Sequence, residues 1–479
     1  MLFSSIIFIF YFLPVFLAVY LMSGLRTSVL LTGSVLFYTW GEGEYILLLG
    51  GLIVLNYWLA GKLAAREGRA RLGMLVLALA VDLGVLGLFK YGNFVSDIGN
   101  DLLGAGTLPH PDLRLPLGIS FFTFQLVSYL VDVYRGQVQP ESKLARFATY
   151  ILMFPHLIAG PIVRYAEIRD ELAVRTHDFA RFGLGLQYFI VGLCQKVLVA
   201  NTLAPLADHA FGLHNSVLDA GTAWLGLLAY TLQIFFDFCG YSNMAIGLAF
   251  MFGFTFPRNF DYPYSSRSIS EFWRRWHMSL SFWFRDYVYI PLGGNRGGTL
   301  ATLRNLGIVF FLTGLWHGAA WNFIFWGLFH GAFLLAERQG VGALLRRLPS
   351  PLAWAYTVLT VMVGWVFFRA DSLSHAVRYL RRMFSPSAIG PLPVDTGLLL
   401  TPEVMMAIVA GVALSFPLLP ALLDRIGVPR IERSPRIPEQ RLDTHYVHAL
   451  PVALLLVGFV LSCALLAGTS LNPFLYFRF

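Results

Sequence analysis

Residues 261–298 read DYPYSSRSISEFWRRWHMSLSFWFRDYVYIPLGGNRGG, and residues 311–331 read FLTGLWHGAAWNFIFWGLFHG. Charged side chains and histidines crowd into these stretches, whereas the surrounding chain is mostly apolar with few charges. Ionisable groups are costly inside a membrane, so those that occur there usually face water, one another or a substrate. We therefore expect the active centre in this region, with the rest of the chain as its housing.

The composition indicates a membrane protein with many spans. Of the 479 residues, 57% are hydrophobic and 13% are charged, whereas soluble domains carry about 25% charged residues. The formal net charge is +8, but the basic residues occur in short links between apolar runs. Such links lie on the cytoplasmic side of membrane proteins. We therefore expect contact with membrane lipid and no nucleic-acid partner.

A membrane span needs roughly 20 mostly apolar residues, and by this criterion the chain contains about 11 to 13 transmembrane or re-entrant helices. Two prolines and a glycine interrupt residues 147–163, which predicts a broken or re-entrant helix there. We expect an external loop at 92–114 and a cytoplasmic link at 62–71. The predicted spans are residues 3–22, 28–40, 45–61, 73–91, 115–136, 179–200, 222–238, 303–316, 319–336, 352–368, 403–420 and 447–468.

These segments predict an all-α fold in a single membrane domain, residues 1–479. Within it we expect N-terminal helices in 1–114, a catalytic core in 115–340 and C-terminal helices in 341–479. No internal repeat at a fixed period is visible, which disfavours the inverted-repeat transporter folds. The three cysteines lie far apart without metal-binding spacing, so we expect neither a metal nor a tightly bound cofactor.

Residues 269–289 are predicted to form one helix with an aromatic-rich surface, on which Arg274 and His277 are neighbours. An interfacial helix without any chemistry is the alternative, because mixed apolar and basic residues also suit that position. The glycine-rich loop PLGGNRGG (291–298) lacks the spacing of a P-loop. Its glycines allow close backbone approach, and Arg296 is suited to contact an anionic group.

His317 lies in the sequence TGLWHGAAWN (313–322), beside a glycine and between two tryptophans. A neutral imidazole can take a proton from a hydroxyl near neutral pH, and the small neighbours leave room for a substrate chain. A structural role is the alternative, and we assign that role to His330, which lacks polar neighbours. No Ser-His-Asp or Cys-His set is visible, so direct transfer between two bound substrates is the simpler scheme.

Polar side chains also occur inside other predicted spans. Gln125, Ser128 and Asp132 share one face of the helix 115–136. They either pack against another helix or line a cavity. Asp237 lies in an apolar run, where an ionisable group is usually paired or functional.

Several motifs resemble those of the membrane-bound O-acyltransferase family, in particular its bacterial branch of alginate O-acetylation proteins. The resemblance covers nearly the whole chain, including MLFSSIIFIFYFLPVF, PLGISFFTFQLVSYLVDVYRG, FPHLIAGPIVR and FFDFCGYSNMAIG. Its most specific motifs are SISEFWRRWHMSLSFWFRDYVYIPLGGNRGG (268–298), GLWHGAAWNFIFWGLFHG (314–331) and the closing NPFLYFRF (472–479).

The resemblance implies a ring of membrane helices in which funnels from the cytoplasm and the periplasm meet in a central tunnel. It implies that His317, in the WHG motif, is the catalytic general base, and that His277, in the RRWH motif, is the second family histidine. Further candidates for lining the tunnel or contacting a substrate are Arg274, Trp276, Trp316, Asn322, Gln125 and Asp237, and candidates for holding the donor anion are Arg285 and Arg296.

The implied reaction passes acetyl groups across the bacterial inner membrane to an exported polysaccharide. The expected donor is a cytoplasmic thioester, either acetyl-coenzyme A or the pantetheine of an acyl carrier. An alginate-like exopolysaccharide is the first acceptor expected, with peptidoglycan or another envelope glycan as the alternative. Because the chain has no large soluble domain, we expect a periplasmic acetyltransferase or esterase-like partner to complete the transfer.

A transporter or channel that moves an acyl donor without chemistry is the alternative of another class. The pair His277 and His317 argues against it, because a pure transporter needs no base at that position. Such a transporter would also be expected to show broken helices repeated in two halves.

Overall fold

The computed structural model describes residues 2–175, 178–214, 216–432 and 446–468. Within these residues, the regular structure is helical apart from one antiparallel ribbon, in which β1 (Arg430–Glu432) pairs with β2 (Tyr446–His448). The predicted all-helical fold is confirmed. The closing motif at 472–479 lies outside the described residues.

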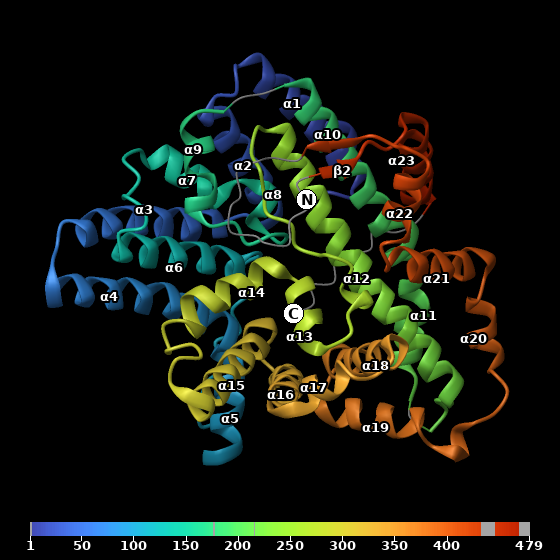
Figure 1. Cartoon of the computed structure of the whole chain (residues 1–479). Helices are drawn as coiled ribbons and strands as arrows, with labels where there is room; N and C mark the ends of the chain where they lie inside the picture. Colours follow the sequence, from blue (N-terminus) through green and yellow to red (C-terminus); the bar gives the residue numbers. More distant parts are fainter. Residues whose placement is uncertain (1, 176–177, 215, 433–445, 469–479) are drawn as a thin grey trace. The chain divides into compact units, whose positions relative to one another are not determined.

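The described residues form two compact units, and Figure 1 labels their helices and strands. Unit 1 contains residues 2–175, 178–189 and 242–257, and unit 2 contains 190–214, 216–241, 258–432 and 446–468. These bounds do not follow the expected subdivision at residues 114 and 340, and the single membrane domain stays a prediction.

The helices of unit 1 are α1 (Leu13–Met22), α2 (Thr27–Glu42), α3 (Tyr45–Ala64), α4 (Gly68–Leu86), α5 (Gly92–Leu103), α6 (Ile119–Arg135), α7 (Leu144–Leu152), α8 (Phe154–Leu157) and α9 (Tyr165–Ala173). Both units receive residues from α10 (Phe179–Cys194) and α12 (Ala220–Met251). The helices of unit 2 are α11 (Thr202–Gly212), α13 (Ile269–Arg275), α14 (Met278–Phe284), α15 (Gly298–His317), α16 (Trp321–Ala336), α17 (Gly342–Leu345), α18 (Ser350–Arg369), α19 (Leu373–Met383), α20 (Val394–Leu399), α21 (Pro402–Leu414), α22 (Leu418–Arg425) and α23 (Val452–Gly468).

The described helices support six or seven membrane spans by length and composition. Six stretches qualify directly, and the bent pair α21 and α22 makes a seventh if it is one span. The predicted number of 11 to 13 is larger because it also counted shorter apolar helices such as Phe8–Met22 and Val452–Gly468. The qualifying stretches are Tyr45–Ala64, Gly68–Leu103, Phe179–Gly212, Ala220–Met251, Gly298–His317 and Ser350–Arg369.

The segment 92–114 differs from the expected external loop. Its first part is α5, which continues α4 through the π-helical turn Gly87–Tyr91. The break expected in 147–163 is present, because α7 ends at Leu152 and the four-residue α8 follows before an extended stretch.

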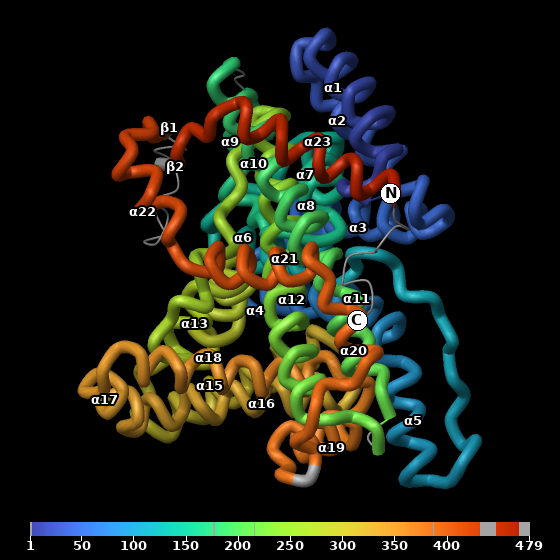
Figure 2. The backbone as a smooth tube through the Cα atoms, turned by 90° about the vertical axis from the view of Figure 1, so that its right-hand side faces the viewer, coloured from blue at the N-terminus to red at the C-terminus, as the bar shows by residue number. Residues whose placement is uncertain are grey.

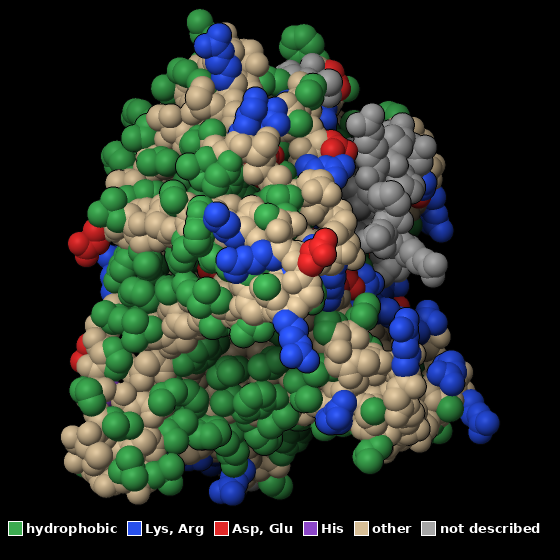
Figure 3. Space-filling model, turned by 90° about the vertical axis from the view of Figure 1, so that its left-hand side faces the viewer, with side chains coloured by type: hydrophobic (Ala, Val, Ile, Leu, Met, Phe, Trp, Pro, Cys, Tyr) green, Lys and Arg blue, Asp and Glu red, His purple; other side chains and the backbone are tan. Residues whose placement is uncertain are grey.

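The surface has the apolar character expected of a lipid-facing protein. Hydrophobic side chains cover broad areas of the face shown in Figure 3, and Lys and Arg occur there in small groups. Trp40 is 70% exposed and Leu47 is 77% exposed. Water would disfavour so many large exposed hydrophobic side chains, so this surface fits a bilayer environment.

Glycines allow the long helices to approach closely within each unit. In unit 1, a Cβ on Gly247 would lie 2.5 Å from the carbonyl oxygen of Gly185, which is shorter than any normal contact. In unit 2, a Cβ on Gly240 would lie 2.6 Å from the carbonyl oxygen of Gly192. Small residues at such points let helix backbones pack together in a membrane.

Candidate active site

A break between α13 and α14 carries His277. α13 ends at Arg275, Trp276 is extended, and His277 has φ 45° and ψ 54° in the left-handed region. The expected single helix over 269–289 is therefore wrong at this point (Figure 1). A left-handed residue other than glycine costs about 1–3 kcal/mol, so the surrounding structure must hold it in place.

The backbone of residues 259–261 bridges the break. The N–H of Asp261 donates to the carbonyl of Arg275 (3.0 Å), and the N–H of Met278 donates to the carbonyl of Asn259 (2.9 Å). These bonds satisfy backbone groups that lose their helical partners where α13 stops and α14 begins. The conformation of the break thus depends on a segment that precedes α13 in the chain.

The side chain of Asn259 fixes the orientation of the His277 ring. Its Oδ1 accepts from the backbone N–H of Ser279 (3.3 Å) and from the Ser279 hydroxyl (2.9 Å). The same oxygen lies 3.1 Å from Nδ1 of His277. Because an amide oxygen accepts hydrogen bonds, Nδ1 carries the proton, and Nε2 is the acceptor nitrogen of the ring.

The second nitrogen of His277 points into a buried apolar environment. Nε2 has no hydrogen-bond partner among the described residues, and the ring meets the edge of Phe238 with centroids 4.6 Å apart. Burial lowers the pKa of His277, which lies outside the candidate spans, to about 3. The ring is therefore neutral at physiological pH and presents one unused acceptor.

His317 is the last residue of α15, at a tight turn into α16. Gly318 follows in extended conformation, and a Cβ there would lie 2.2 Å from the ring of Phe323. Two further glycines join the helices: a Cβ on Gly314 would lie 2.4 Å from the carbonyl oxygen of Phe323, and a Cβ on Gly327 would lie 2.2 Å from that of Phe310. Close glycine packing thus fixes the position of His317.

Aromatic rings connect the two histidines. The ring centroid of Trp316 lies 6.1 Å from that of His277 and 4.8 Å from that of His317. Trp326 and Phe368 contact His317 from other sides, with centroids 4.9 and 5.2 Å away. His317 is 4% exposed. The structure therefore brings His277, Trp316 and His317 together in one water-poor aromatic cluster.

A cavity of about 660 Å³ lies elsewhere in unit 2. We call it the arginine pocket, because four arginines contribute to its walls together with two glutamates. It is bordered by α13, by the segment that follows α16, and by Leu306 of α15. The charged residues that line it are Arg267, Arg274, Arg338, Arg346, Glu271 and Glu337.

The start of α13 forms one wall of this pocket and is strongly anchored. Ser268 caps the helix by accepting from the N–H of Glu271 (3.0 Å). The carboxylate of Glu337 accepts from the N–H of Ile269 (2.6 Å) and from the N–H and the hydroxyl of Ser270 (2.9 and 2.6 Å). Carboxylates at a helix N-terminus also interact favourably with the helix dipole.

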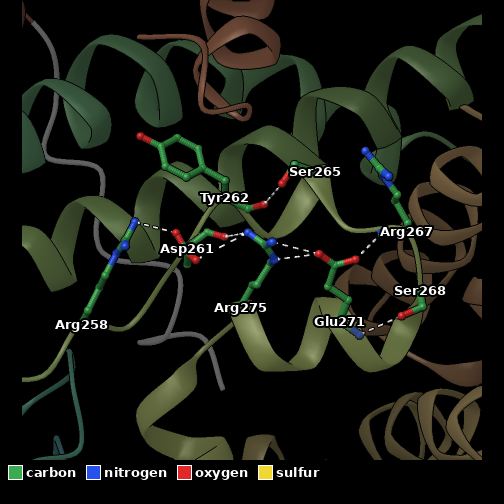
Figure 4. A network of polar contacts seen from close by, with 8 residues as sticks. All are labelled: Arg258, Asp261, Tyr262, Ser265, Arg267, Ser268, Glu271 and Arg275. Atoms are coloured by element: carbon green, nitrogen blue, oxygen red, sulfur yellow. Dashed lines mark hydrogen bonds and ion pairs between the residues drawn. The ribbon is translucent and has the colours of Figure 1, made fainter. Parts of the chain in front are cut away.

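An ion-pair network crosses the other side of α13 (Figure 4). Arg275 contacts Glu271 at 2.9 Å and Asp261 at 3.5 Å, and Arg258 contacts Asp261 at 2.8 Å. Arg275 also donates to the backbone carbonyl of Asp261. The network joins the chain before α13 to the end of α13, directly ahead of His277.

The remaining candidates of the RRWH and WHG motifs lie in different surroundings. Arg274 lines the arginine pocket. Trp276 is buried against Trp365, with ring centroids 4.9 Å apart. Asn322 donates to the carbonyls of Phe367 (3.3 Å) and Ala370 (2.8 Å), so it caps the end of α18.

Asp237 and Gln125 lie outside the aromatic cluster. Asp237 of α12 forms an ion pair with Lys196, and both side chains are buried. Gln125 of α6 belongs to unit 1, where it is buried and its side-chain amide has no partner among the described residues. A buried amide without a partner is unusual in a folded protein.

The two arginines expected to hold the donor anion do not line the arginine pocket. Arg285 is paired with the adjacent Asp286 (2.6 Å) and stacks over Phe282 (4.9 Å). Arg296 lies exposed in the glycine-rich loop. Among the described residues, no group of three His, Cys, Asp or Glu side chains is arranged to hold a metal ion.

Sequence reasoning missed most of the arginine pocket. Arg267, Arg338, Arg346 and Glu337 were not among the candidates, although Arg338 and Arg346 belong to a basic link between two apolar runs. In the sequence, a basic link of this kind indicates only which side of the membrane it lies on. Its convergence with α13 could not be recognised, because the two segments are about 70 residues apart.

Comparisons with known proteins agree with the sequence motifs. Residues 100–368, more than half of the chain, match the family described as MBOAT, membrane-bound O-acyltransferase. The probable alginate O-acetylase AlgI of Pseudomonas aeruginosa is 49% identical over 393 residues, which cover 80% of this chain and 75% of that protein. Its counterpart in Pseudomonas putida is 42% identical over 488 residues, covering 100% of both chains. A peptidoglycan O-acetyltransferase of Helicobacter pylori is 37% identical over 421 residues, covering 80% of each.

Proposed function

The chain belongs to the membrane-bound O-acyltransferase family, and from that premise we propose that it acetylates an exported, alginate-like polysaccharide. It is a multi-pass membrane protein and an O-acyltransferase. The observation that carries the choice of acceptor is the similarity over 100% of both chains to a probable alginate O-acetylase. The peptidoglycan enzyme is less similar, at 37% identity, and makes peptidoglycan the second candidate acceptor.

The alternative of another class, a transporter or channel without chemistry, does not fit membership of an acyltransferase family. We place the protein in the bacterial inner membrane, with its basic links in the cytoplasm. The donor is a cytoplasmic acetyl thioester, either acetyl-coenzyme A or an acylated carrier pantetheine. A periplasmic acetyltransferase or esterase-like protein receives or completes the transfer outside.

In this mechanism, His317 acts as the general base. Its imidazole takes the proton of the acceptor hydroxyl as the hydroxyl oxygen attacks the thioester carbonyl carbon. The carbon–sulfur bond breaks, the acetyl ester forms, and the imidazolium returns its proton to the leaving thiolate. A positioned general base contributes about 10²–10⁴-fold in rate. Support comes from the aromatic surroundings of His317, which exclude water that would compete with the acceptor.

His277 has a different role in this proposal. Its Nδ1 is committed to Asn259, and its Nε2 remains an acceptor in a ring that lies next to Trp316, the neighbour of His317. A neutral ring in this tautomer can hold an N–H or O–H group of a substrate. We assign it to orienting the donor or acceptor, while His317 moves the proton.

The test is the O-acetyl content of envelope polysaccharides, measured by NMR in a strain that lacks the protein. The strain is complemented with the wild type, His317→Ala, His277→Ala or the control His214→Ala, which changes an exposed histidine. Protein levels in the membrane are measured in parallel. We expect normal acetylation with the control and its loss with His317→Ala.

Two results would contradict the proposal. If the His317→Ala protein is present at the wild-type level and acetylation is normal, His317 is not the general base. Loss of acetyl groups from peptidoglycan alone, with the exopolysaccharide unchanged, rejects the alginate-like acceptor.

A further inference from the structure

We propose that the arginine pocket is a phosphate-binding site that holds the phosphate end of the thioester donor. This assignment rests on the proposed function, because it names the part of the protein that holds the donor. It replaces Arg285 and Arg296 as the donor-anion residues, since neither lines this cavity.

The arginines of the pocket form no ion pairs with the described carboxylates of the protein. Arg267, Arg274, Arg338 and Arg346 line it, and no described carboxylate lies within ion-pair distance of any of their side chains. Figure 4 shows the guanidinium of Arg267 pointing away from the nearby ion-pair network. Arginines that line a cavity without forming ion pairs favour an anionic ligand.

The two carboxylates of the pocket do not neutralise these arginines. Glu271 is paired with Arg275, which is not part of the lining, and also accepts from the backbone N–H of Arg267 (2.9 Å). Both oxygens of Glu337 accept hydrogen bonds at the start of α13. The carboxylates are thus used within the fold, while the four arginines line the cavity without a carboxylate partner of their own among the described residues.

The chemistry of the walls favours phosphate. Guanidinium groups bind phosphate oxygens through paired N–H donors, and several can share one group with two or more negative charges. The Ser268 hydroxyl, whose oxygen accepts at the helix cap, borders the same cavity and can donate to a phosphate oxygen, whereas the Ser270 hydroxyl is donated to Glu337. With a volume of about 660 Å³, the pocket has room for a phosphate ester together with part of its organic chain.

The pocket lies at a distance that suits a long donor. Leu306 lines it, and His317 lies 11 residues further along the same helix, α15. At 1.5 Å per residue, this separation is about 16 Å. A ligand whose phosphate occupies the pocket therefore needs an extended arm to bring a thioester to His317. Coenzyme A and phosphopantetheine have such an arm, whereas a small acyl phosphate does not.

The orientation agrees with a cytoplasmic donor. The pocket borders the chain between α16 and α18, which contains Arg338, Arg346 and Arg347 and a single acidic residue, Glu337. A short link with this excess of basic residues lies on the cytoplasmic side. Figure 2 shows α17, part of this link, at one end of α15, α16 and α18.

The experiment measures ligand binding by the purified full-length protein in phosphatidylcholine nanodiscs. The probes are 4′-phosphopantetheine and pantetheine, which differ by the phosphate alone. A second arm adds phosphatidylglycerol to the nanodiscs and measures retained lipid by native mass spectrometry, because an anionic headgroup carries the same chemistry. The variants are Arg338→Gln/Arg346→Gln, its charge-conserving counterpart Arg338→Lys/Arg346→Lys, and the control Arg347→Gln, an exposed neighbour outside the lining.

We expect the double glutamine variant to bind 4′-phosphopantetheine about tenfold or more weakly, the effect of losing charge-assisted hydrogen bonds. We expect every variant to bind pantetheine as the wild type does. The lysine variant is expected to fold normally, and Arg347→Gln is expected to bind 4′-phosphopantetheine with wild-type affinity. A loss of phosphatidylglycerol retention with unchanged binding of 4′-phosphopantetheine identifies a lipid headgroup as the ligand and overturns the assignment to the donor. If a folded double glutamine variant binds 4′-phosphopantetheine and phosphatidylglycerol as the wild type does, the assignment is overturned.

Failure of the proposed function gives a different pattern. His317→Ala leaves the pocket intact, so it is expected to bind 4′-phosphopantetheine normally while transferring no acetyl group. If the wild type binds the probe through these arginines but acetylates no polysaccharide, the pocket stands and the proposed function fails.

Discussion

Oδ1 of Asn259 lies 3.1 Å from Nδ1 of His277, across the break between α13 and α14. Because the same oxygen accepts two hydrogen bonds from Ser279, one side chain sets both the tautomer of the histidine and the shape of the break. The integrity of the site should therefore depend on Asn259 as much as on the histidine.

Asn259→Ala is expected to lower the stability of the protein by about 1–3 kcal/mol, because it leaves the buried Nδ1–H of His277 without an acceptor. Acetyl transfer should fall with it. The measurement is thermal unfolding in detergent together with the O-acetyl assay, and Asn295→Ala in the exposed loop is the control. An Asn259→Ala protein with wild-type melting temperature and activity would show that the contact is dispensable.

Gly327→Val is expected to destabilise the α15–α16 hairpin by about 1–3 kcal/mol or more, the usual cost of overpacking. Its Cβ would lie 2.2 Å from the carbonyl oxygen of Phe310, a backbone atom that cannot move without moving α15. Gly307→Ala is the control, because that position in α15 has open space around it. Membrane protein level and melting temperature check this, and equal values for the two variants argue against the close packing.

Substitutions in the buried ion pair of Lys196 and Asp237 distinguish a structural role of Asp237 from a functional one. Lys196→Met alone is expected to cost about 3–5 kcal/mol, because it leaves a buried charge without its partner. Lys196→Met/Asp237→Leu should recover much of that loss, as measured by thermal unfolding of the single and double variants. If the double variant folds but transfers no acetyl group, Asp237 contacts substrate after all.

Glu337→Gln is expected to loosen the start of α13 and lower stability by about 1–2 kcal/mol, because the amide keeps one of the two acceptor oxygens and loses the charge at the helix N-terminus. Glu403→Gln, at an exposed position in the first turn of α21, is the matched control. Unfolding temperatures report the difference. No difference between the two variants would mean that the three hydrogen bonds to Glu337 contribute little.

The sequence was sufficient for the fold class, because apolar runs are local signals, and its motifs singled out His277 and His317, both of which lie next to Trp316. The break at His277 could not be predicted, since aromatic and basic residues continue smoothly through 269–289. The group that stabilises the left-handed histidine, Asn259, lies 18 residues earlier. Helix-forming patterns give no information about such a partner.

The arginine pocket was hidden for a related reason. Its walls come from α13 and from the segment after α16, and the contact between them depends on Glu337 reaching the N–H of Ile269, 68 residues away. A basic link also has an ordinary explanation in membrane topology. The choice of Arg285 and Arg296 followed from their place in a conspicuous motif, and the structure pairs or exposes them elsewhere.

The seven residues of α13 have a consequence for how the protein can respond to its substrate. Ser270 and Arg274 of this short helix both border the arginine pocket, and Arg274 lies three residues before His277, where the backbone is strained. One short helix therefore joins the proposed donor site to the strained backbone that carries His277.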